Sequence, residues 1–234
     1  MTYSQLTSIP LFWGISGDDL AIIMDRVELL DIKLLPGEVF VGSGDVCQGM
    51  AIVRDGIMSR KRVYHAGTFV NSRKQKTDLS YQVTETLSPG FILEPEILFG
   101  LEQRHRNTWT AVTTCHLTLI GKDDIRQTLM YVPVWRINFL NLLCTQLQRS
   151  QEDGLPMVTP DDTGRVRQFI SRHCSINGET MQTDITLEQL GHFLGMERRM
   201  VSSVIAELEG LGQLVKERKR LFVPHVGRLV AKSG

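Results

Sequence analysis

The sequence predicts a mixed α+β chain with a β-rich N-terminal region, one long helix, and a smaller C-terminal region of helices and a hairpin. Short apolar runs separated by glycine-containing turns fill residues 31–122, which favours a sandwich or barrel. An apolar repeat with helical spacing follows Pro133, and residues 163–234 contain three more helix-like stretches before a hairpin-like one. The 234 residues, 42% of them apolar and 22% charged, exclude a disordered chain and suffice for one large domain or two ordinary ones.

The first expected element is a helix that begins after Ser16. Ser16 can cap the helix, and Asp18 and Asp19 place negative charge in its first turn. Apolar residues then recur at three- and four-residue steps from Leu20 to Val27. These features predict an amphipathic helix ahead of the strands.

The long helix is expected within residues 131–155. Pro133 suits a helix start, and Gly154, Pro156 and Pro160 predict a break and a linker. An apolar seam in coiled-coil register predicts a dimerisation helix, with packing against its own barrel alone as the alternative. The seam residues are Ile137, Leu140, Cys144, Leu147 and Gln151.

Two of the C-terminal helices have the spacing of a helix-turn-helix. Thr186 and Gln189 have capping-box spacing, and Gly195 permits a tight turn before a second helix over residues 198–208. Apolar residues fall on the inner face of each helix, which leaves Arg198 and Arg199 outside near the start of the second. In such a motif this end of the helix meets base edges in the major groove.

A basic hairpin over residues 214–223 completes the pattern of a winged helix-turn-helix, because a basic wing can lie along a phosphate backbone. An ordinary three-helix domain with solvated arginines is the alternative. Arginine and serine side chains suit guanine and phosphate contacts. The expected DNA-binding residues are Thr186, Gln189, Arg198, Arg199, Ser202, Ser203, Lys216, Arg218, Lys219 and Arg220.

Charge is unevenly distributed although the whole chain has 26 basic and 26 acidic residues. Residues 1–162 carry 15 basic and 19 acidic side chains, and residues 163–234 carry 11 and 7. The C-terminal part therefore has net charge +4 and the rest −4, which is a weak sign of polyanion binding.

Several other classes of protein are disfavoured. The four cysteines form no CxxC pair and are expected to be small buried residues in a reducing cytoplasm. No apolar run approaches 18 residues, so no membrane span is expected. No nucleophile–base pair, metal motif or P-loop is present, so we expect no enzyme.

The chain resembles the Crp/Fnr family of bacterial transcription regulators over nearly its full length. The resemblance rests on the segments 36–40, 44–45, 87–91, 111–115 and 162–166 and on Gly56. It implies a cyclic-nucleotide-binding-type β-roll, which is a double-stranded jelly-roll barrel, then a dimerisation helix and a winged helix-turn-helix. The implied domains are residues 1–130, 131–155 and 156–234, and the implied assembly is a homodimer on a pseudo-palindromic DNA site.

The ligand cassette departs from the family pattern. Family members that bind cyclic nucleotides carry a Gly-Glu pair, whereas this chain has Glu94-Pro95-Glu96 and lacks the Arg-Ser-Ala that follows. A phosphate cradle needs free backbone N–H groups and a placed arginine, so cyclic AMP or GMP is disfavoured. The ligand candidates that remain are Glu94, Glu96, Arg104 and Arg106, and the effector is unidentified. Haem stays open, with His65, His105, His116, Met50 and Cys115 as possible ligands, and no metal site is assigned.

We therefore expect a sequence-specific DNA-binding regulator that senses a signal other than cyclic AMP. Its expected partners are double-stranded DNA, a second copy of the chain and RNA polymerase. One alternative keeps the β-roll only as a scaffold, and another is a ligand-binding protein that acts on protein partners. The basic segment 60–76 predicts a long hairpin with a solvated tip, or one that contacts polymerase or flanking DNA.

Overall fold

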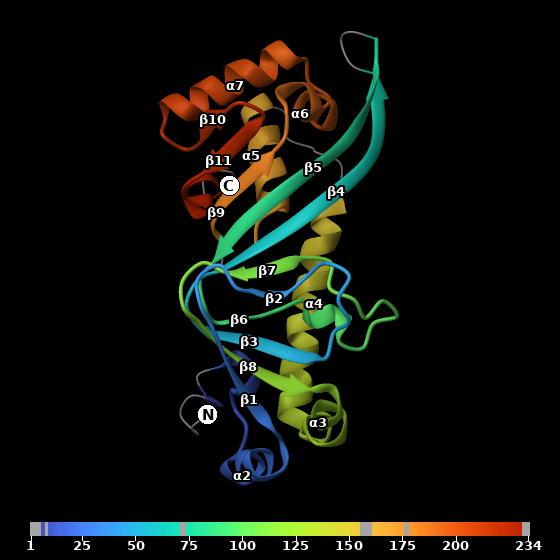
Figure 1. The fold of residues 1–234 in the computed structure, drawn as a ribbon, viewed down its shortest axis with the longest axis vertical. Helices are drawn as coiled ribbons and strands as arrows, with labels where there is room; N and C mark the ends of the chain where they lie inside the picture. The colour runs from blue at the N-terminus through green and yellow to red at the C-terminus, as the bar shows by residue number, and fades with distance from the viewer. Residues whose placement is uncertain (1–5, 8, 71–73, 155–160, 176–177, 231–234) are drawn as a thin grey trace. The chain divides into compact units, whose positions relative to one another are not determined.

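The computed structural model describes residues 6–7, 9–70, 74–154, 161–175 and 178–230. The chain divides into two compact units (Figure 1). Unit 1 comprises Met1–Ile57, Pro89–Arg106 and Ala111–Gly154, and unit 2 comprises Met58–Ser88, Asn107–Thr110 and Leu155–Gly234. Both units mix helix and strand, which confirms the predicted α+β class.

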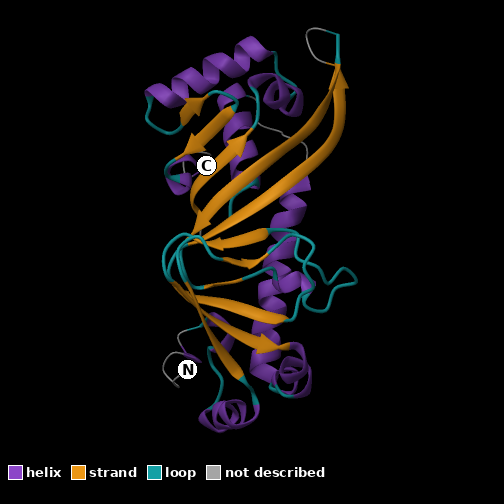
Figure 2. Cartoon of the chain, viewed as in Figure 1, coloured by secondary structure: helices purple, strands orange, loops and turns teal. Residues whose placement is uncertain are grey.

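The sheet of unit 1 has four antiparallel strands in the order β1-β8-β3-β6 (Figure 2). Among the described residues these strands form an open sheet and do not close into a barrel. The strands of this unit are β1 (Leu29–Leu34), β2 (Val39–Val41), β3 (Gly49–Asp55), β6 (Phe91–Ile92) and β8 (Cys115–Gly121), of which β2 is not part of the four-stranded sheet.

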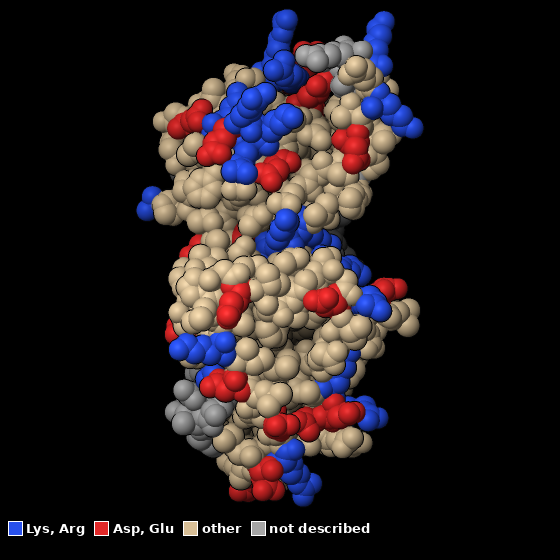
Figure 3. Space-filling view, viewed as in Figure 1, with Lys and Arg blue, Asp and Glu red and all other residues tan. Residues whose placement is uncertain are grey.

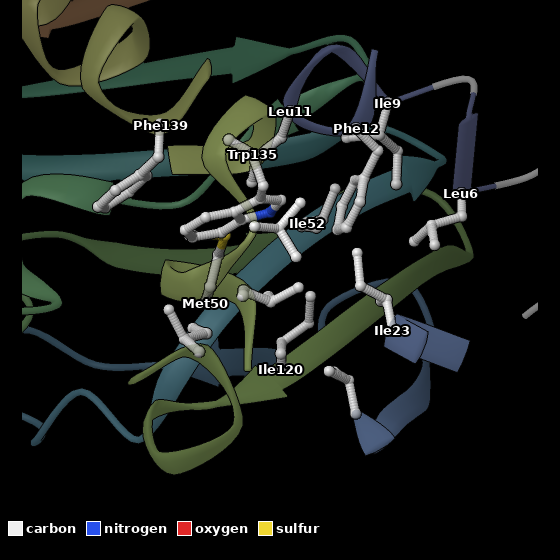
Figure 4. Packing of buried hydrophobic residues seen from close by; sticks show 14 of the residues in the cluster. Leu6, Ile9, Leu11, Phe12, Ile23, Met50, Ile52, Ile120, Trp135 and Phe139 are labelled. Atoms are coloured by element: carbon white, nitrogen blue, oxygen red, sulfur yellow. The ribbon is translucent and has the colours of Figure 1, made fainter. Parts of the chain in front are cut away.

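The helices of unit 1 pack on this sheet. Ser16 caps α2 by accepting a hydrogen bond from the Asp19 N–H, as predicted. Trp135 and Phe139 of α4 stack on each other and lie in the core with Phe12 (Figure 4). The helical elements are η1 (Pro10–Phe12), α2 (Gly17–Arg26), η2 (Pro95–Ile97), α3 (Lys122–Gln127), η3 (Leu129–Tyr131) and α4 (Pro133–Gly154).

Unit 2 is built on strands in the order β10-β11-β9-β5-β4-β7. Its apolar core joins Phe169, Leu190 and Ile205 from three helices to Tyr81 and Val83 of β5. Its elements are β4 (Met58–Val70), β5 (Lys76–Leu87), β7 (Thr108–Ala111), α5 (Asp162–Arg172), β9 (Gly178–Asp184), α6 (Leu187–Leu194), α7 (Arg198–Gly210), β10 (Val215–Glu217), β11 (Arg220–Val223) and α8 (Val226–Val230).

The long hairpin β4–β5 belongs to unit 2 although it comes early in the sequence. The reason is the antiparallel pairing of β5 with β9, from Gln82 opposite Asp184 to Leu87 opposite Gly178. The division into domains 1–130, 131–155 and 156–234 stays a prediction. Within the described chain, no helix combines the length and apolar character that a bilayer crossing needs.

Candidate nucleic-acid interface

The start of α6 is fixed by a reciprocal cap. Thr186 Oγ1 accepts from the Gln189 N–H at 3.2 Å, and Gln189 Oε1 accepts from the Thr186 N–H at 2.9 Å. This confirms the predicted capping box and satisfies two N–H groups that a helix start leaves open.

The turn from α6 to α7 depends on two glycines. Gly195 has φ +63°, the left-handed conformation that glycine adopts most easily. A side chain at Gly191 would come within 2.6 Å of the Met196 carbonyl oxygen, so this position needs a glycine for close backbone approach. The Met196 N–H donates to the Gly191 carbonyl at 2.9 Å and closes the turn.

Burial of the inner faces sets the orientation of α7. Leu190 and Leu194 of α6 are buried, as are four residues of α7: Val201, Val204, Ile205 and Leu208. With that face turned inward, Arg198, Arg199 and Ser203 are exposed and Ser202 is half-buried. The outer face near the start of α7 is therefore polar and basic, as the sequence predicts.

The strands β10 and β11 form the predicted basic hairpin, here called the wing. Lys219 turns it with φ +61°. Arg220 is held by Asp184 at 3.0 Å and Glu217 at 3.5 Å, whereas Lys216, Arg218 and Lys219 are exposed. The wing thus presents positive charge and keeps one arginine in an ion-pair network.

A groove joins the wing to the starts of α6 and α7. Its lining includes Thr186, Arg198 and the wing residues 216–220, together with the acidic Glu188. Figure 3 shows lysine and arginine side chains gathered over this part of unit 2. The excess of basic groups makes the groove suitable for an anionic backbone.

The structure brings nine of the ten expected DNA-binding side chains to this groove or to the outer face of α7. Gln189 is directed elsewhere. Its Oε1 caps α6, and its Nε2 donates to the Asp78 and Ser80 carbonyls of β5, each at 3.3 Å. Gln189 therefore links the helix-turn-helix to the long hairpin.

The helix α4 has two apolar flanks. Trp135 and Phe139 are buried in unit 1, while the seam residues Ile137, Leu140 and Leu147 are 55%, 47% and 58% exposed. Cys144 is also exposed and Cys174 is half-buried, so the expectation that all four cysteines are buried is wrong for these two. Gln151 lies in α4, but its side chain is outside the described residues.

The expected ligand residue Glu94 is engaged inside unit 1. It has φ +39°, its Oε2 lies 2.8 Å from His105 Nδ1, and its Oε1 accepts from the Arg106 N–H at 2.9 Å. Both Glu94 and His105 are buried. Burial opposes the charged imidazole, but hydrogen bonds with Cys47 and Glu94 outweigh it and raise the pKa of His105 to about 9.

The other ligand candidates lie on the surface of unit 1. Arg104 is exposed and donates to the Gly44 carbonyl at 2.8 Å, and Glu96 and Arg106 are exposed as well. None of the four candidates lines the basic groove described above. Their role as ligand contacts stays a prediction.

The haem candidates fall in both units. Met50, Cys115 and His105 are buried in unit 1, where His116 is half-buried, and His65 of unit 2 lies 2.8 Å from Ser80 Oγ. Among the described residues, no group of three or more histidine, cysteine, aspartate or glutamate side chains is arranged to hold a metal ion.

The sequence interpretation missed the buried polar pairs, the Glu94–His105 pair above all. Glu94 and His105 lie eleven positions apart and outside helices and strands, so no periodic pattern in the sequence predicts their pairing. Pro95 has no N–H to offer a phosphate, and Glu94 ahead of it accepts a hydrogen bond from within the chain, from the Arg106 N–H.

No protein-family model matches the chain, and no curated protein matches it. Several solved structures are similar. The catabolite activator protein of Thermus thermophilus has 18% identity and a TM-score of 0.46, with 96% of this chain and 100% of that chain covered. The c-di-GMP-responsive regulator CLP of Xanthomonas campestris has 14% identity and a TM-score of 0.47, covering 89% and 99%. FixK2 of Bradyrhizobium japonicum has 15% identity and a TM-score of 0.43, covering 88% and 98%. At this distance, only the chain's own residues bear on its function.

Proposed function

We propose that the protein is a sequence-specific DNA-binding transcription regulator that acts as a homodimer on a pseudo-palindromic site. The observation that carries this proposal is the arrangement of α6, α7 and the wing around one basic groove. Arg198, Arg199 and Ser203 stand exposed at the start of α7, where a recognition helix meets base edges. RNA polymerase is a further partner in this proposal.

The two kinds of contact have separate roles in this proposal. The wing and the cap of α6 bind phosphates, which gives affinity that depends on salt. Arg198 and Arg199 read base edges, because arginine can donate two hydrogen bonds to guanine. The polar residues Ser202 and Ser203 supply shorter contacts beside them.

The dimer rests on the exposed seam of α4. An isolated helix in water gains nothing by exposing Ile137, Leu140 and Leu147, whereas a second copy of the helix buries them in knobs-into-holes packing. Two copies also place two recognition helices on one DNA molecule, about 34 Å apart if they enter successive major grooves.

Cyclic AMP is not the effector in this proposal. Pro95 has no N–H to offer a phosphate, and both carboxylate oxygens of Glu94 already accept hydrogen bonds from His105 and Arg106. The same buried pair favours a second candidate, in which unit 1 is a ligand-independent scaffold for the dimer. Addition of cyclic AMP should leave DNA affinity unchanged in both versions, and an absorbance spectrum of the purified protein, with or without a Soret band, decides on haem.

The test is selection of duplexes from a random-sequence pool with the purified full chain. We expect enrichment of a two-fold symmetric sequence with half-sites about one helical turn apart. Enrichment of no sequence over the starting pool would overturn the assignment, and enrichment of a single half-site would overturn the dimer.

Disulfide cross-linking tests the α4 seam directly. Of the four cysteines only Cys144 is exposed, and an interhelical disulfide needs Cα atoms within about 7 Å. Mild oxidation should give a covalent dimer that the Cys144→Ser variant does not form. Adding Leu147→Cys to the Cys144→Ser variant should restore the cross-link if the two helices are parallel and in register. If neither the wild type nor this double variant forms a cross-link, the seam is contradicted.

A further inference from the structure

The long hairpin β4–β5 is held in unit 2 by buried polar contacts. Glu85 is fully buried and lies 2.7 Å from Arg60 Nη2, while Ser175 donates to it from both Oγ, at 3.0 Å, and its backbone N–H. Arg60 also donates to the His173 carbonyl at 3.1 Å. These contacts fix the hairpin to the turn between α5 and β9. Removing Arg60 would leave the buried Glu85 charge uncompensated, which makes the contacts costly to break.

Aromatic packing fixes the same hairpin further along. His173 Nδ1 donates to the Phe169 carbonyl at 2.6 Å, so its Nε2 accepts from the Tyr81 hydroxyl at 2.7 Å. Tyr81 also packs edge-on against Phe193 of α6, and Phe69 lies against His192. The hairpin is thus one rigid part of the unit that carries α6 and α7.

The distal end of the hairpin continues past the helix-turn-helix. Gln189 of α6 contacts β5 at Asp78 and Ser80. Lys76 is the first residue of β5, two residues beyond Asp78, so the extended strand carries it about 7 Å past that contact. Lys74 lies two residues further on, outside the strand, with φ +59°. Figure 1 shows this end of the hairpin projecting beyond α6, at the end of unit 2 where α7 lies.

The wing and the hairpin are separate basic elements of the same sheet. Four strand intervals separate β10 from β4 in the sheet, which at about 4.8 Å each amounts to about 19 Å. The major groove is about 12 Å wide. Within the sheet, the wing and the hairpin are therefore separated by more than the width of a major groove, which suits contacts to phosphates on both sides of α7.

We propose that the distal end of β4–β5 is a second DNA-backbone contact, in which Lys74 and Lys76 bind phosphates flanking the recognition site. Both lysine side chains are exposed. The acidic residue of the hairpin nearest to them in the chain is Asp78, two residues from Lys76, so the hairpin's distal end carries more positive than negative charge. A duplex is favoured over a protein partner because the lysines belong to the same rigid unit as Arg198 and the wing. This inference rests on the proposed function, since it assigns a further part of the DNA footprint.

The test compares two lengths of the duplex selected by the wild-type full chain, one trimmed to the enriched site and one with ten extra base pairs at each end. The Lys74→Gln, Lys76→Gln double variant should bind the long duplex about fivefold to tenfold more weakly at physiological salt. Its plot of log affinity against log salt should be shallower by about 1 for each lost phosphate contact. Binding to the trimmed duplex should change little.

The matched control is Lys61→Gln combined with Lys33→Gln, which removes the same charge from exposed positions away from the hairpin's distal end. Its affinity for both duplexes should equal that of the wild type. Equal binding of the Lys74/Lys76 variant and the wild type to the long duplex, with an unchanged salt slope, overturns the flank contact and leaves the proposed function intact. If the wild type itself shows no salt-dependent binding to any duplex, the proposed function fails first.

Discussion

The two units of the molecule carry net charges of opposite sign. Unit 1 has 9 basic and 15 acidic residues, and unit 2 has 17 and 11. Net charges of −6 and +6 exceed the −4 and +4 found by dividing the sequence at residue 162, because the basic hairpin β4–β5 belongs with the C-terminal residues. Folding therefore concentrates positive charge in the unit that carries α7 and the wing.

One buried histidine in each unit shows the same contrast. His105 of unit 1 lies beside the Glu94 carboxylate, and its pKa rises to about 9. His173 of unit 2 is buried near Arg60, Arg62 and Arg172, and burial together with these charges lowers its pKa to about 4 despite the hydrogen bond to the Phe169 carbonyl. The His105 site of unit 1 therefore contains a charged pair, whereas the imidazole of His173 in unit 2 stays neutral although the buried Arg60–Glu85 ion pair lies beside it.

The largest expected effect comes from breaking the pair in unit 1. Glu94→Ala leaves the buried His105 without its carboxylate and should lower the free energy of unfolding by about 3–5 kcal/mol. Urea unfolding followed by tryptophan fluorescence measures the loss. Glu96→Ala, an exposed neighbour, is the control and should change stability by less than about 0.5 kcal/mol. Equal stability of the two variants would show that the Glu94–His105 pair is not structural.

The corresponding change in unit 2 should affect DNA binding rather than folding. Arg198→Ala or Arg199→Ala should cost about 1–3 kcal/mol of binding to the selected duplex and relax the preference at one base position, because a bidentate guanine contact is lost. Fluorescence anisotropy measures the affinity. Arg126→Ala, which removes an exposed arginine of unit 1, should bind as the wild type does. Unchanged affinity and unchanged preference in both α7 variants would remove them from the recognition surface.

The two histidines predict stability changes of opposite sign with pH. The folded pKa of His105 lies above its unfolded value of about 6.5, so its contribution is full below pH 6.5 and is lost as pH rises toward 9. The folded pKa of His173 lies below its unfolded value, so its contribution is full above pH 6.5 and is lost as pH falls toward 4. Each contribution is on the order of 1–3 kcal/mol.

Urea titrations of the wild type, His105→Gln and His173→Gln between pH 5 and 9 separate these contributions. The first variant should lose the alkaline slope of stability and the second the acidic slope. The same pH profile in all three proteins would contradict the assigned ionisation states.

The predictable parts of the fold are those with local signals. The cap at Thr186, the turn at Gly195 and the helical spacing of α7 lie within a few residues of one another, so the sequence predicts the helix-turn-helix well. The strand β9 escaped prediction because, of its two buried residues, Met181 and Thr183, only the first is apolar. Its partner β5 lies about a hundred residues earlier, and no local pattern encodes that pairing.

The site followed the same rule. Exposure of Arg198 and Arg199 follows from helical periodicity, whereas the role of Gln189 in holding β5 depends on tertiary contact. The residue before a proline normally has an extended backbone, but Glu94 adopts a left-handed one. The local backbone preference therefore did not predict the conformation in which Glu94 is buried.

Salt dependence of duplex binding tests the central claim most directly. The full chain is titrated with the selected duplex and with a scrambled duplex of the same length, each over about 50–200 mM salt. The proposed regulator should bind both with an affinity that falls steeply as salt rises, and should bind the selected duplex at least about a thousandfold more tightly. Affinity that does not change with salt, or that is the same for both duplexes, would contradict the assignment of α7 and the wing as a sequence-reading surface.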